Sequence, residues 1–294
     1  LRISRTPTLC PLSAMSSSPP ATRRSMWLQQ PYWRSTIFLG SVRSRFLREY
    51  RNAERRLLFF DYDGTLREFT KRPDEAVPDS GLLSILEKLT KDPRNEVVIV
   101  SGRDRYFLER HFAEAGVGLV AGHGVWIRSK GEEWRLSEPL SDEWKKILLP
   151  IMERFSLRTP GASVEEKDYS LAWHYRRAEP DLSVVRVAEL KEALLGFINS
   201  YQLTVLEGNR VLEVKPSGIN KGRGAAFWLA REAWDFILAL GDDVTDEDLF
   251  AVIPKKGYPV KVGPGSSRAK FFLESPREVR RLLAAMGESP PVLG

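Results

Sequence analysis

Short apolar runs alternate with polar stretches along most of the chain, beginning near Arg56. Continuous runs of this kind are typical of strands that are buried on both faces of a parallel sheet. Between them lie stretches with apolar residues at helical spacing, for example Leu82, Leu86 and Leu89. The runs expected to form core strands are LLFF (57–60), EVVIV (96–100), VGLVAG (117–122), FILAL (236–240) and YPVKV (258–262). Alternating strand and helix signals predict an α/β fold with a doubly wound parallel sheet.

Residues 126–216 follow a different pattern, which predicts an inserted α+β cap domain. Strand-like pieces lie at 169–176 and 211–216, and helix-like pieces lie near 142–155 and 184–200. We therefore expect a discontinuous core domain, made of residues 56–125 and 217–287, with the cap between its two parts.

The two ends of the chain lack such patterns. Residues 1–40 are rich in Ser, Thr, Pro and Arg and poor in acids, which predicts disorder, although a transit peptide has a similar composition. Residues 41–56 are compatible with a short basic helix. We expect residues 1–55 to be a disordered or linker extension and residues 288–294 to be a tail.

The charge of the chain is unevenly distributed. Residues 1–56 hold 11 arginines and no lysine against two acids, a net charge of +9, so the remainder carries −3 of the chain's +6. The main body therefore does not favour nucleic-acid binding. No stretch approaches about 18 uninterrupted apolar residues, so no membrane association is expected. The single cysteine, Cys10, excludes a disulfide framework and fits a cytoplasmic location. The histidines His111, His123 and His174 lack the close spacing of a histidine zinc site.

The segment RLLFFDYDGTL (56–66) is the strongest chemical signal. An apolar strand ends in Asp61 and Asp63, followed by Gly64, which permits a sharp turn. Ligands of open α/β sheets bind beyond the carboxyl ends of the strands. A calcium loop is disfavoured because the twelfth residue from Asp61 is Arg72 rather than Glu. A plain turn at the strand end remains an alternative.

A second acidic segment, GDDVTDEDLF (241–250), also follows an apolar strand. Its carboxylates repel one another, and a hard cation would relieve that repulsion. The alternative is an acidic first turn of a helix. The acids are Asp242, Asp243, Asp246, Glu247 and Asp248. Two carboxylate sets at the ends of core strands together predict a shared Mg²⁺ site.

Two further pieces predict a phosphate site. Ser101-Gly102-Arg103 follows a strand and offers a hydroxyl and backbone amides. Lys221 stands at the start of a predicted helix, where its charge can neutralise phosphate. Each piece alone is common in unrelated proteins and is therefore weak evidence. The stronger evidence is the order of the four motifs along the chain: the Asp61–Asp63 segment, Ser101-Gly102-Arg103, Lys221 and the acidic segment 241–250.

That ordered set resembles the haloacid dehalogenase-like phosphatase superfamily over residues 56–287, and its finer details resemble the trehalose-6-phosphate phosphatase family. The segment 46–66 also resembles the junction at which fused synthase–phosphatase proteins enter their phosphatase half. The segments of closer resemblance are DYDGTL (61–66), the pair His123-Gly124, EEKDYSLAWHYR (165–176), GNRVLEVKPSGINKG (208–222) and GDDVTDEDLF (241–250).

The resemblance implies a role for each core residue. Asp61 is expected to attack phosphorus, and Asp63 to act as general acid and base. Ser101, Gly102 and Lys221 are expected to hold the phosphoryl group. The expected ligands of Mg²⁺ are Asp61, the backbone carbonyl of Asp63, and Asp242. Asp243 and Asp246 are expected either to bind the ion indirectly or to orient Lys221 and water molecules.

The cap is expected to supply specificity for a disaccharide. The resemblance implies that Glu165 and Lys167 contact sugar hydroxyls. An alternative is that the alternating charges form a solvated sheet face. A lone histidine such as His174 more often has a structural role than a ligand-binding one. The complete set of expected substrate contacts is His123, Glu165, Lys167, His174, Arg176 and Glu213.

The resemblance therefore implies hydrolysis of trehalose 6-phosphate to trehalose and phosphate through an aspartyl-phosphate, in trehalose biosynthesis. The expected partners are a small-molecule sugar phosphate and a trehalose-phosphate synthase. Three alternatives stay open: another sugar phosphatase such as a sucrose-phosphate phosphatase, a catalytically inactive regulatory domain, and a phosphomutase.

Overall fold

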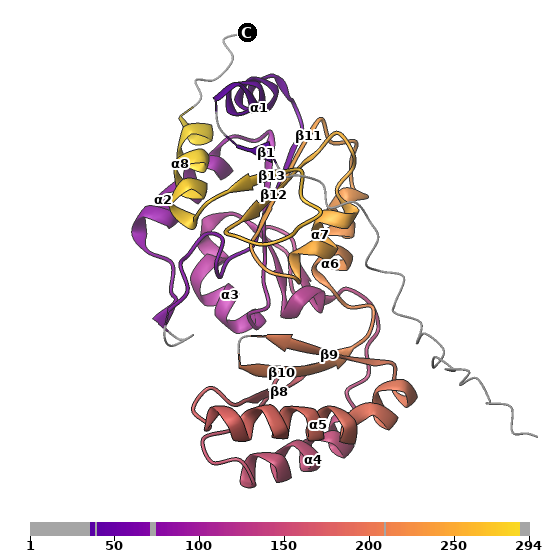
Figure 1. Cartoon of the computed structure of the whole chain (residues 1–294). Helices are drawn as coiled ribbons and strands as arrows, with labels where there is room; N and C mark the ends of the chain where they lie inside the picture. Colours follow the sequence, from indigo (N-terminus) through magenta and orange to yellow (C-terminus); the bar gives the residue numbers. More distant parts are fainter. Residues whose placement is uncertain (1–35, 39, 71–74, 209, 289–294) are drawn as a thin grey trace, which may run out of the picture. The chain divides into compact units, whose positions relative to one another are not determined.

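A computed structural model describes residues 36–38, 40–70, 75–208 and 210–288 (Figure 1). All of these residues belong to one compact unit. The disorder expected of residues 1–40 is wrong for Thr36–Ile37, which form a short strand of the sheet. Residues 1–35 and the last six residues of the expected tail lie outside the described residues. No helix in the described ranges has the length and apolar character needed to cross a membrane.

The core of the described chain is a nine-stranded sheet in the order β1-β13-β12-β11-β2-β3-β4-β5-β6. The pairings from β1 to β4 are parallel, and β5 and β6 add an antiparallel edge. The strands are β1 (Thr36–Ile37), β2 (Arg56–Phe60), β3 (Asn95–Val100), β4 (Gly118–Ala121), β5 (Trp126–Arg128), β6 (Arg135–Leu136), β11 (Phe236–Gly241), β12 (Tyr258–Val262) and β13 (Phe271–Leu273). The chain adds β3 and β4 on one side of β2 and later adds β11 to β13 on the other. Strand β2 therefore lies at the topological switch point, beyond which ligands of such sheets bind.

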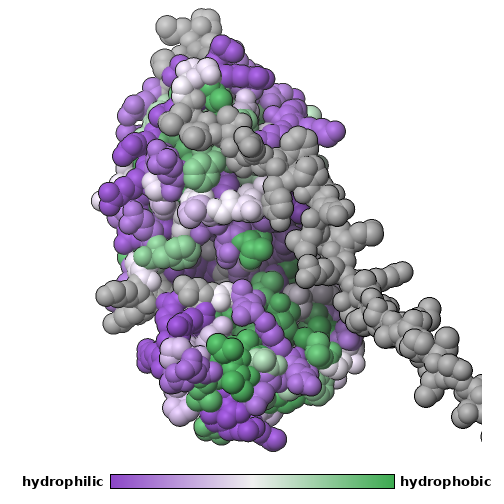
Figure 2. All heavy atoms as spheres, in the orientation of Figure 1, coloured by the Kyte–Doolittle hydropathy of each residue, from purple (hydrophilic) through white to green (hydrophobic). Residues whose placement is uncertain are grey.

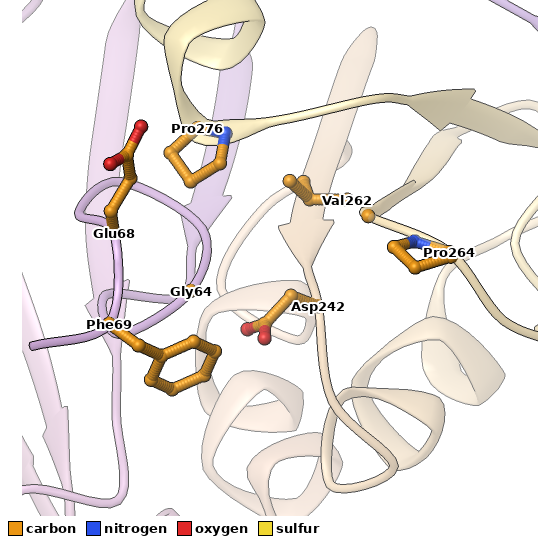
Figure 3. Close-up of a pocket in the computed structure, with 8 residues that line it drawn as sticks. Gly64, Glu68, Phe69, Asp242, Val262, Pro264 and Pro276 are labelled. Atoms are coloured by element: carbon orange, nitrogen blue, oxygen red, sulfur yellow. The ribbon is translucent and has the colours of Figure 1, made fainter.

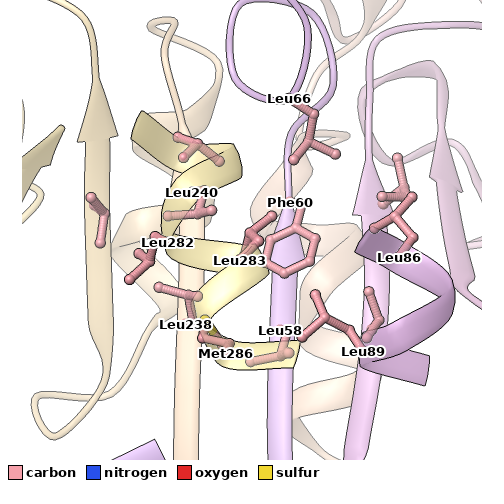
Figure 4. Close-up of a cluster of buried hydrophobic side chains, with 14 of the residues drawn as sticks. Leu58, Phe60, Leu66, Leu86, Leu89, Leu238, Leu240, Leu282, Leu283 and Met286 are labelled. Atoms are coloured by element: carbon pink, nitrogen blue, oxygen red, sulfur yellow. The ribbon is translucent and has the colours of Figure 1, made fainter. Parts of the chain in front are cut away.

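Helices cover both faces of this sheet, and β2 shows why its residues form a continuous apolar run. Leu58 and Phe60 point into a cluster with helices α2 and α8 (Figure 4), whereas Leu57 and Phe59 pack against Trp228 of α6 on the opposite face. The core helices are α1 (Gly40–Asn52), α2 (Ser80–Lys91), α3 (Arg105–Phe112), α6 (Lys221–Leu229), α7 (Asp246–Val252) and α8 (Pro276–Gly287), with short 3₁₀ turns η3 (Ala113–Ala115) and η4 (Gly122–Gly124). The predicted doubly wound α/β fold is confirmed.

Helix α1 is an integral part of the core. Phe46 is fully buried, and its ring centroid lies 5.1 Å from that of Phe236 and 4.9 Å from that of Tyr258. Tyr50, one turn further on, is buried as well. The short basic helix expected in this segment is confirmed. The expectation that residues 1–55 form only an extension or linker is wrong for α1, because two apolar residues at helical spacing are embedded among its arginines.

The inserted cap consists of a four-stranded antiparallel sheet, in the order β7-β8-β10-β9, packed against two helices. Its elements are α4 (Lys145–Leu157), β7 (Ser163–Glu166), β8 (Leu171–His174), α5 (Pro180–Ser200), β9 (Leu203–Gly208) and β10 (Val211–Pro216). The α+β character is as expected, but the expected boundary at residue 126 is wrong. Strands β5 and β6 pair with β4 as a hairpin, so they extend the core sheet and the cap follows them. Figure 2 shows apolar surface over the cap helices, where Leu157, Val184 and Leu195 are exposed.

Candidate active site

Three side chains predicted from the sequence follow three neighbouring strands at their carboxyl ends. Asp61 follows β2, Ser101 follows β3 and Asp242 follows β11. Asp61 and Ser101 are 3% and 1% exposed. The Asp61 backbone N–H donates to the carbonyl oxygen of Leu240 at 3.0 Å, which fixes the register of the two acidic segments. The sheet thus brings residues about 180 positions apart in sequence to a single edge.

Lys221 links the two acidic segments. Its ammonium Nζ lies 2.7 Å from Asp61 Oδ1 and 2.8 Å from Asp246 Oδ1, and all three side chains are buried. Burial would lower the pKa of Lys221, but the Asp246 and Asp61 carboxylates raise it overall, so the lysine stays charged. Asn220 caps α6 by accepting a hydrogen bond from Arg223 N, and this places Lys221 in the first turn of the helix.

Asp61, Asp242 and Asp246 form a carboxylate cluster in which one oxygen of each lies within 4.8 Å of the others. Burial raises the pKa of Asp61 well above its usual range, and burial raises that of Asp242 to about 6. Asp61 Oδ2 is buried and has no hydrogen-bond partner among the described residues. An all-oxygen cluster with an unpartnered carboxylate oxygen suits a hard divalent cation, which would relieve the charge repulsion.

Asp246 organises the loop that carries Asp242. Its Oδ2 accepts hydrogen bonds from the backbone N–H groups of Asp242 and Asp243, both at 3.0 Å. Asp243 is exposed, and its carboxylate accepts from Val244 N at 2.6 Å rather than joining the cluster. Of the two residues expected to bind the ion indirectly or to orient Lys221, Asp246 therefore contacts Lys221, and Asp243 lies outside the cluster.

The turn after β2 fits closely against Asp242. Thr65 Oγ1 donates to Asp242 Oδ1 at 3.2 Å. Gly64 has a φ of +83°, and a Cβ atom there would lie 2.1 Å from Asp242 Oδ2. Any side chain at this position would collide with the carboxylate, so glycine is required. A cavity of about 400 Å³ opens beside Asp242 and is bordered by apolar residues such as Phe69 and Pro264 (Figure 3).

Asp63 has a different partner from Asp61. Its two carboxylate oxygens accept from Arg103, with Nε–Oδ2 at 2.7 Å and Nη2–Oδ1 at 2.6 Å. Arg103 was contained in the Ser-Gly-Arg motif but received no role from the sequence. The available signal was an arginine directly after the Ser-Gly pair that is expected to bind phosphate, but its partner 40 residues earlier was not apparent.

His123 connects the loop of Ser101 and Gly102 with the cap. A Cβ atom on Gly102 would lie 2.4 Å from the His123 ring, so glycine permits this close approach. His123 Nε2 lies 3.8 Å from Glu213 Oε2 of the cap. Burial lowers the pKa of His123 to about 3, although Glu213 opposes this effect, so the ring is neutral near pH 7.

Four of the expected sugar-binding residues of the cap form two pairs, each joined by a polar contact between its side chains. His174 Nε2 lies 2.7 Å from Glu165 Oε2, and Lys167 Nζ donates to Glu213 Oε1 at 3.4 Å. Burial would raise the pKa of Glu213, but Lys167 and His123 outweigh it and the value falls to about 2. Arg176 lies in an exposed turn after β8.

A cavity of about 500 Å³ runs between the cap and the core. Glu165 and Lys167 line it from the cap, and Arg105 and Trp126 line it from the core. The other four residues expected to contact the substrate are not among the described residues that line this cavity: His123, His174, Arg176 and Glu213. The dimensions suit a ligand of disaccharide size.

The parallel sheet, the aspartate pair at its switch point and the Lys221–Asp246 pair define a haloacid dehalogenase-like phosphatase core. A haloacid dehalogenase-like hydrolase from Bacteroides thetaiotaomicron has this fold, with a TM-score of 0.60 and 15% identity over 79% of this chain and 98% of that chain. At that identity, the likeness concerns the fold alone.

The family follows from closer matches. Residues 59–277 match the model of the trehalose-phosphatase family, and the chain belongs to this family. The C-terminal domain of trehalose-6-phosphate phosphatase from Candida albicans is 34% identical, with a TM-score of 0.78 over 87% of this chain and 98% of that domain. A bifunctional trehalose-6-phosphate synthase/phosphatase from Thermoproteus tenax is 41% identical over 80% of this chain and 32% of its own length. The chain thus spans about a third of the length of the curated relatives it matches.

Proposed function

We propose that this chain hydrolyses trehalose 6-phosphate to trehalose and phosphate in trehalose biosynthesis. The observation that carries the proposal is the buried Asp61–Lys221–Asp246 arrangement in a member of the trehalose-phosphatase family. Burying three charged groups costs stability, and a catalytic site is where such a cost has a purpose. An inactive regulatory domain would not need them.

In the first step, Asp61 attacks phosphorus and an aspartyl-phosphate forms. The bond between phosphorus and the sugar oxygen breaks, and Asp63 gives that oxygen a proton. Lys221 has three N–H donors, of which Asp61 and Asp246 occupy two, so the third remains for a phosphoryl oxygen. Ser101 and the backbone of Gly102 hold the remaining phosphoryl oxygens.

In the second step, a water molecule attacks the aspartyl-phosphate and transfers a proton to Asp63. The bond between phosphorus and Asp61 breaks, phosphate leaves, and both aspartates return to their initial states. One residue thus serves as acid in the first step and as base in the second.

We further propose that the enzyme depends on Mg²⁺, held by Asp61, Asp242 and the backbone carbonyl of Asp63. The unpartnered Asp61 Oδ2 and the raised pKa of Asp242 support a cation at this position. A bound Mg²⁺ would offset the negative charge of the carboxylates and of the phosphoryl group. Asp246 acts through Lys221 and the loop backbone, and Asp243 acts at most through water.

Specificity is proposed to come from the cavity between core and cap. Glu165 and Lys167 would bind sugar hydroxyls, supported by His174 and Glu213, and His123 would contact the sugar from the core. Arg176, in its exposed turn, would contribute only if the cap moves.

Released phosphate from a panel of substrates tests this function. With Mg²⁺, kcat/KM for trehalose 6-phosphate should exceed that for glucose 6-phosphate and sucrose 6-phosphate by roughly 10–100-fold. A higher value for sucrose 6-phosphate would support a sucrose-phosphate phosphatase. No release from any substrate would support an inactive regulatory domain, and Asp61→Asn is the control for contaminating activity.

Two further proposals concern a partner protein and the location of the chain in the cell. The bifunctional Thermoproteus tenax relative supports a physical association with a trehalose-phosphate synthase. Co-purification of the chain with a synthase from the same cell would test it. The single cysteine supports a cytoplasmic location, which imaging of the tagged protein in its own cell would test.

A further inference from the structure

We propose that Arg103 is a positioning residue whose forked ion pair holds the Asp63 carboxylate in place for both proton transfers. The inference rests on the proposed function, because that function gives Asp63 the role of acid and base. It concerns a residue to which the sequence motifs assigned no role.

The contact has the geometry of a two-pronged pair. Nε of Arg103 donates to one oxygen of Asp63 at 2.7 Å and Nη2 donates to the other at 2.6 Å. Two parallel hydrogen bonds fix both the position and the plane of a carboxylate, which a single contact from a lysine ammonium does not. Among the described residues, Arg103 is the only side chain that hydrogen-bonds the Asp63 carboxylate.

Arg103 is itself held from several directions. Its guanidinium lies over the Phe107 ring, 4.5 Å from the centroid. Its backbone N–H donates to Ser101 Oγ at 3.1 Å, and its carbonyl oxygen accepts from Gly122 N at 2.8 Å. The acid–base residue is therefore tied to the same loop that carries the phosphate-binding serine. This connection would keep a constant distance between the proton donor and the phosphoryl group.

The pair leaves room for proton transfer. A carboxylate has about four lone-pair sites, and Arg103 occupies two of them, so Asp63 can carry or accept a proton while the pair persists. The side chains of Arg103 and Asp63 are 16% and 27% exposed, so the pair reaches solvent. Lys221 contacts Asp61 and Asp246 instead, so the two cations serve different carboxylates.

The two proton transfers can be separated with a second substrate. A sugar alkoxide needs a proton to leave, whereas p-nitrophenolate leaves without one. Hydrolysis of the aspartyl-phosphate needs the base with either substrate. A misplaced Asp63 should therefore slow the first step with trehalose 6-phosphate but only the second step with p-nitrophenyl phosphate.

The experiment compares Arg103→Met and Arg103→Lys with wild type by rapid-quench kinetics of the Mg²⁺-loaded enzyme. Arg110→Met is the matched control, because Arg110 is an exposed arginine of the adjacent helix α3. With p-nitrophenyl phosphate, Arg103→Met should release one equivalent of nitrophenolate at nearly the wild-type rate. Turnover should then be roughly 10–100-fold slower, as expected for a misplaced catalytic group. Phosphorylated Asp61 should accumulate and be detectable by mass spectrometry after acid quench.

With trehalose 6-phosphate, the first turnover itself should slow by roughly 10–100-fold, with little change in KM. Arg103→Lys should show the same pattern to a smaller extent, because it keeps the charge but loses the fork. This second variant also decides the question if Arg103→Met does not fold. Equal slowing of the first turnover with both substrates would overturn the proposal, since Arg103 would then bind the phosphoryl group or support the fold.

Asp63→Asn and the double variant separate this inference from the proposed function. If Arg103 acts through Asp63, adding Arg103→Met to Asp63→Asn should cause little further loss, and additive losses would overturn the inference. If wild type leaves trehalose 6-phosphate intact but hydrolyses the aryl phosphate, the proposed substrate is wrong. The burst with the aryl phosphate then still decides the role of Arg103.

Discussion

The Lys221 ammonium lies 2.7 Å from a carboxylate oxygen of Asp61, and both side chains are almost fully buried. A buried ion pair contributes little net stability, but removing one partner leaves an uncompensated charge in a medium that solvates it poorly. The same pair can therefore be essential for turnover and have opposite effects on stability, depending on which partner is replaced.

Lys221→Met should abolish turnover and destabilise the fold by about 3–5 kcal/mol, because Asp61 and Asp246 lose their shared counter-charge. Asp61→Asn should also abolish turnover, but it keeps an oxygen that Lys221 can contact and removes a negative charge near Asp242. Its melting temperature should equal or exceed that of wild type. Denaturant titration and turnover of both variants check this contrast, and an unchanged stability in Lys221→Met would contradict it.

Mg²⁺ should raise the melting temperature of the wild-type protein, because binding to the folded state alone stabilises it. At a concentration 100-fold above Kd, the gain is about 2.7 kcal/mol. Asp242→Asn should remove most of this shift, since it removes one proposed ligand. Asp248→Asn, at an exposed acid in the first turn of helix α7 that follows the Asp242 loop, is the matched control and should keep this shift. A full Mg²⁺ shift in Asp242→Asn would place the cation elsewhere.

The sequence was most informative where one-dimensional order determines three-dimensional position. The apolar runs of β2 and β11 predicted buried neighbouring strands, and the residues that follow them, Asp61 and Asp242, meet at one edge because parallel strands share it. The Arg103–Asp63 contact could not be predicted in this way, because it depends on the direction in which a loop side chain points.

The sequence also did not predict which residues are buried by segments that lie far away along the chain. The arginines around Phe46 and Tyr50 masked an apolar face that is covered by strands about 190–210 residues later. Trp126 begins a hairpin strand that looks like the start of the cap until its pairing with β4 is known.

A substitution in helix α1 should lower the stability of the fold without changing turnover. Phe46→Ala should destabilise the protein by about 3–5 kcal/mol, the usual cost of removing a buried phenylalanine. The partners Phe236 and Tyr258 begin β11 and β12, so the helix packs at the amino ends of these strands, opposite to Asp61. Turnover well below the melting temperature should therefore stay near wild type. Arg45→Ala, on the exposed side of α1, should change neither property, and a large loss of turnover in folded Phe46→Ala would contradict the separation.

The pKa of His123, lowered to about 3 by burial, predicts sensitivity to acid. An unfolded histidine has a pKa of about 6.5, so below that pH the unfolded chain binds a proton that the folded chain refuses. The contribution of His123 to stability should therefore fall as the pH decreases from about 6.5 towards 3, by at most about 1.4 kcal/mol per pH unit for one proton. The carboxyl groups of Asp61 and Asp242, whose pKa values burial raises, contribute with the opposite sign.

Relative to wild type, His123→Asn should show a stronger rise, or a smaller fall, of melting temperature as the pH decreases from about 6.5 to 4.5. Asp242, whose pKa burial raises to about 6, titrates in the same window, but it does so in both proteins and cancels in the comparison. Asparagine is suitable because His123 has a φ of +55°, which asparagine tolerates. His111→Asn is the control, because His111 is only half-buried. This variant should keep more of the wild-type dependence of melting temperature on pH. An unchanged slope in His123→Asn would show that other groups govern the acid response.

The cap pair Glu165 and Lys167 should affect the sugar substrate far more than a small aryl phosphate. Each hydrogen bond from a charged group contributes about 1.5–3 kcal/mol, or roughly 10–100-fold in kcat/KM. Replacing both residues with Ala should therefore lower kcat/KM for trehalose 6-phosphate by at least that range, through both KM and kcat, because remote binding also orients the phosphate. An aryl phosphate lacks sugar hydroxyls, so its hydrolysis should change little.

The ratio of the two activities is the measurement, since it cancels damage that both substrates experience. Lys191 and Glu207 form a matched ion pair elsewhere on the cap, between α5 and β9, and their double replacement should leave the ratio unchanged. Equal losses on both substrates in the Glu165 and Lys167 variant would mean that the pair supports the fold. Little loss on either would mean that the sugar is held by other residues of the cavity, such as Arg105 and Trp126 on its core side.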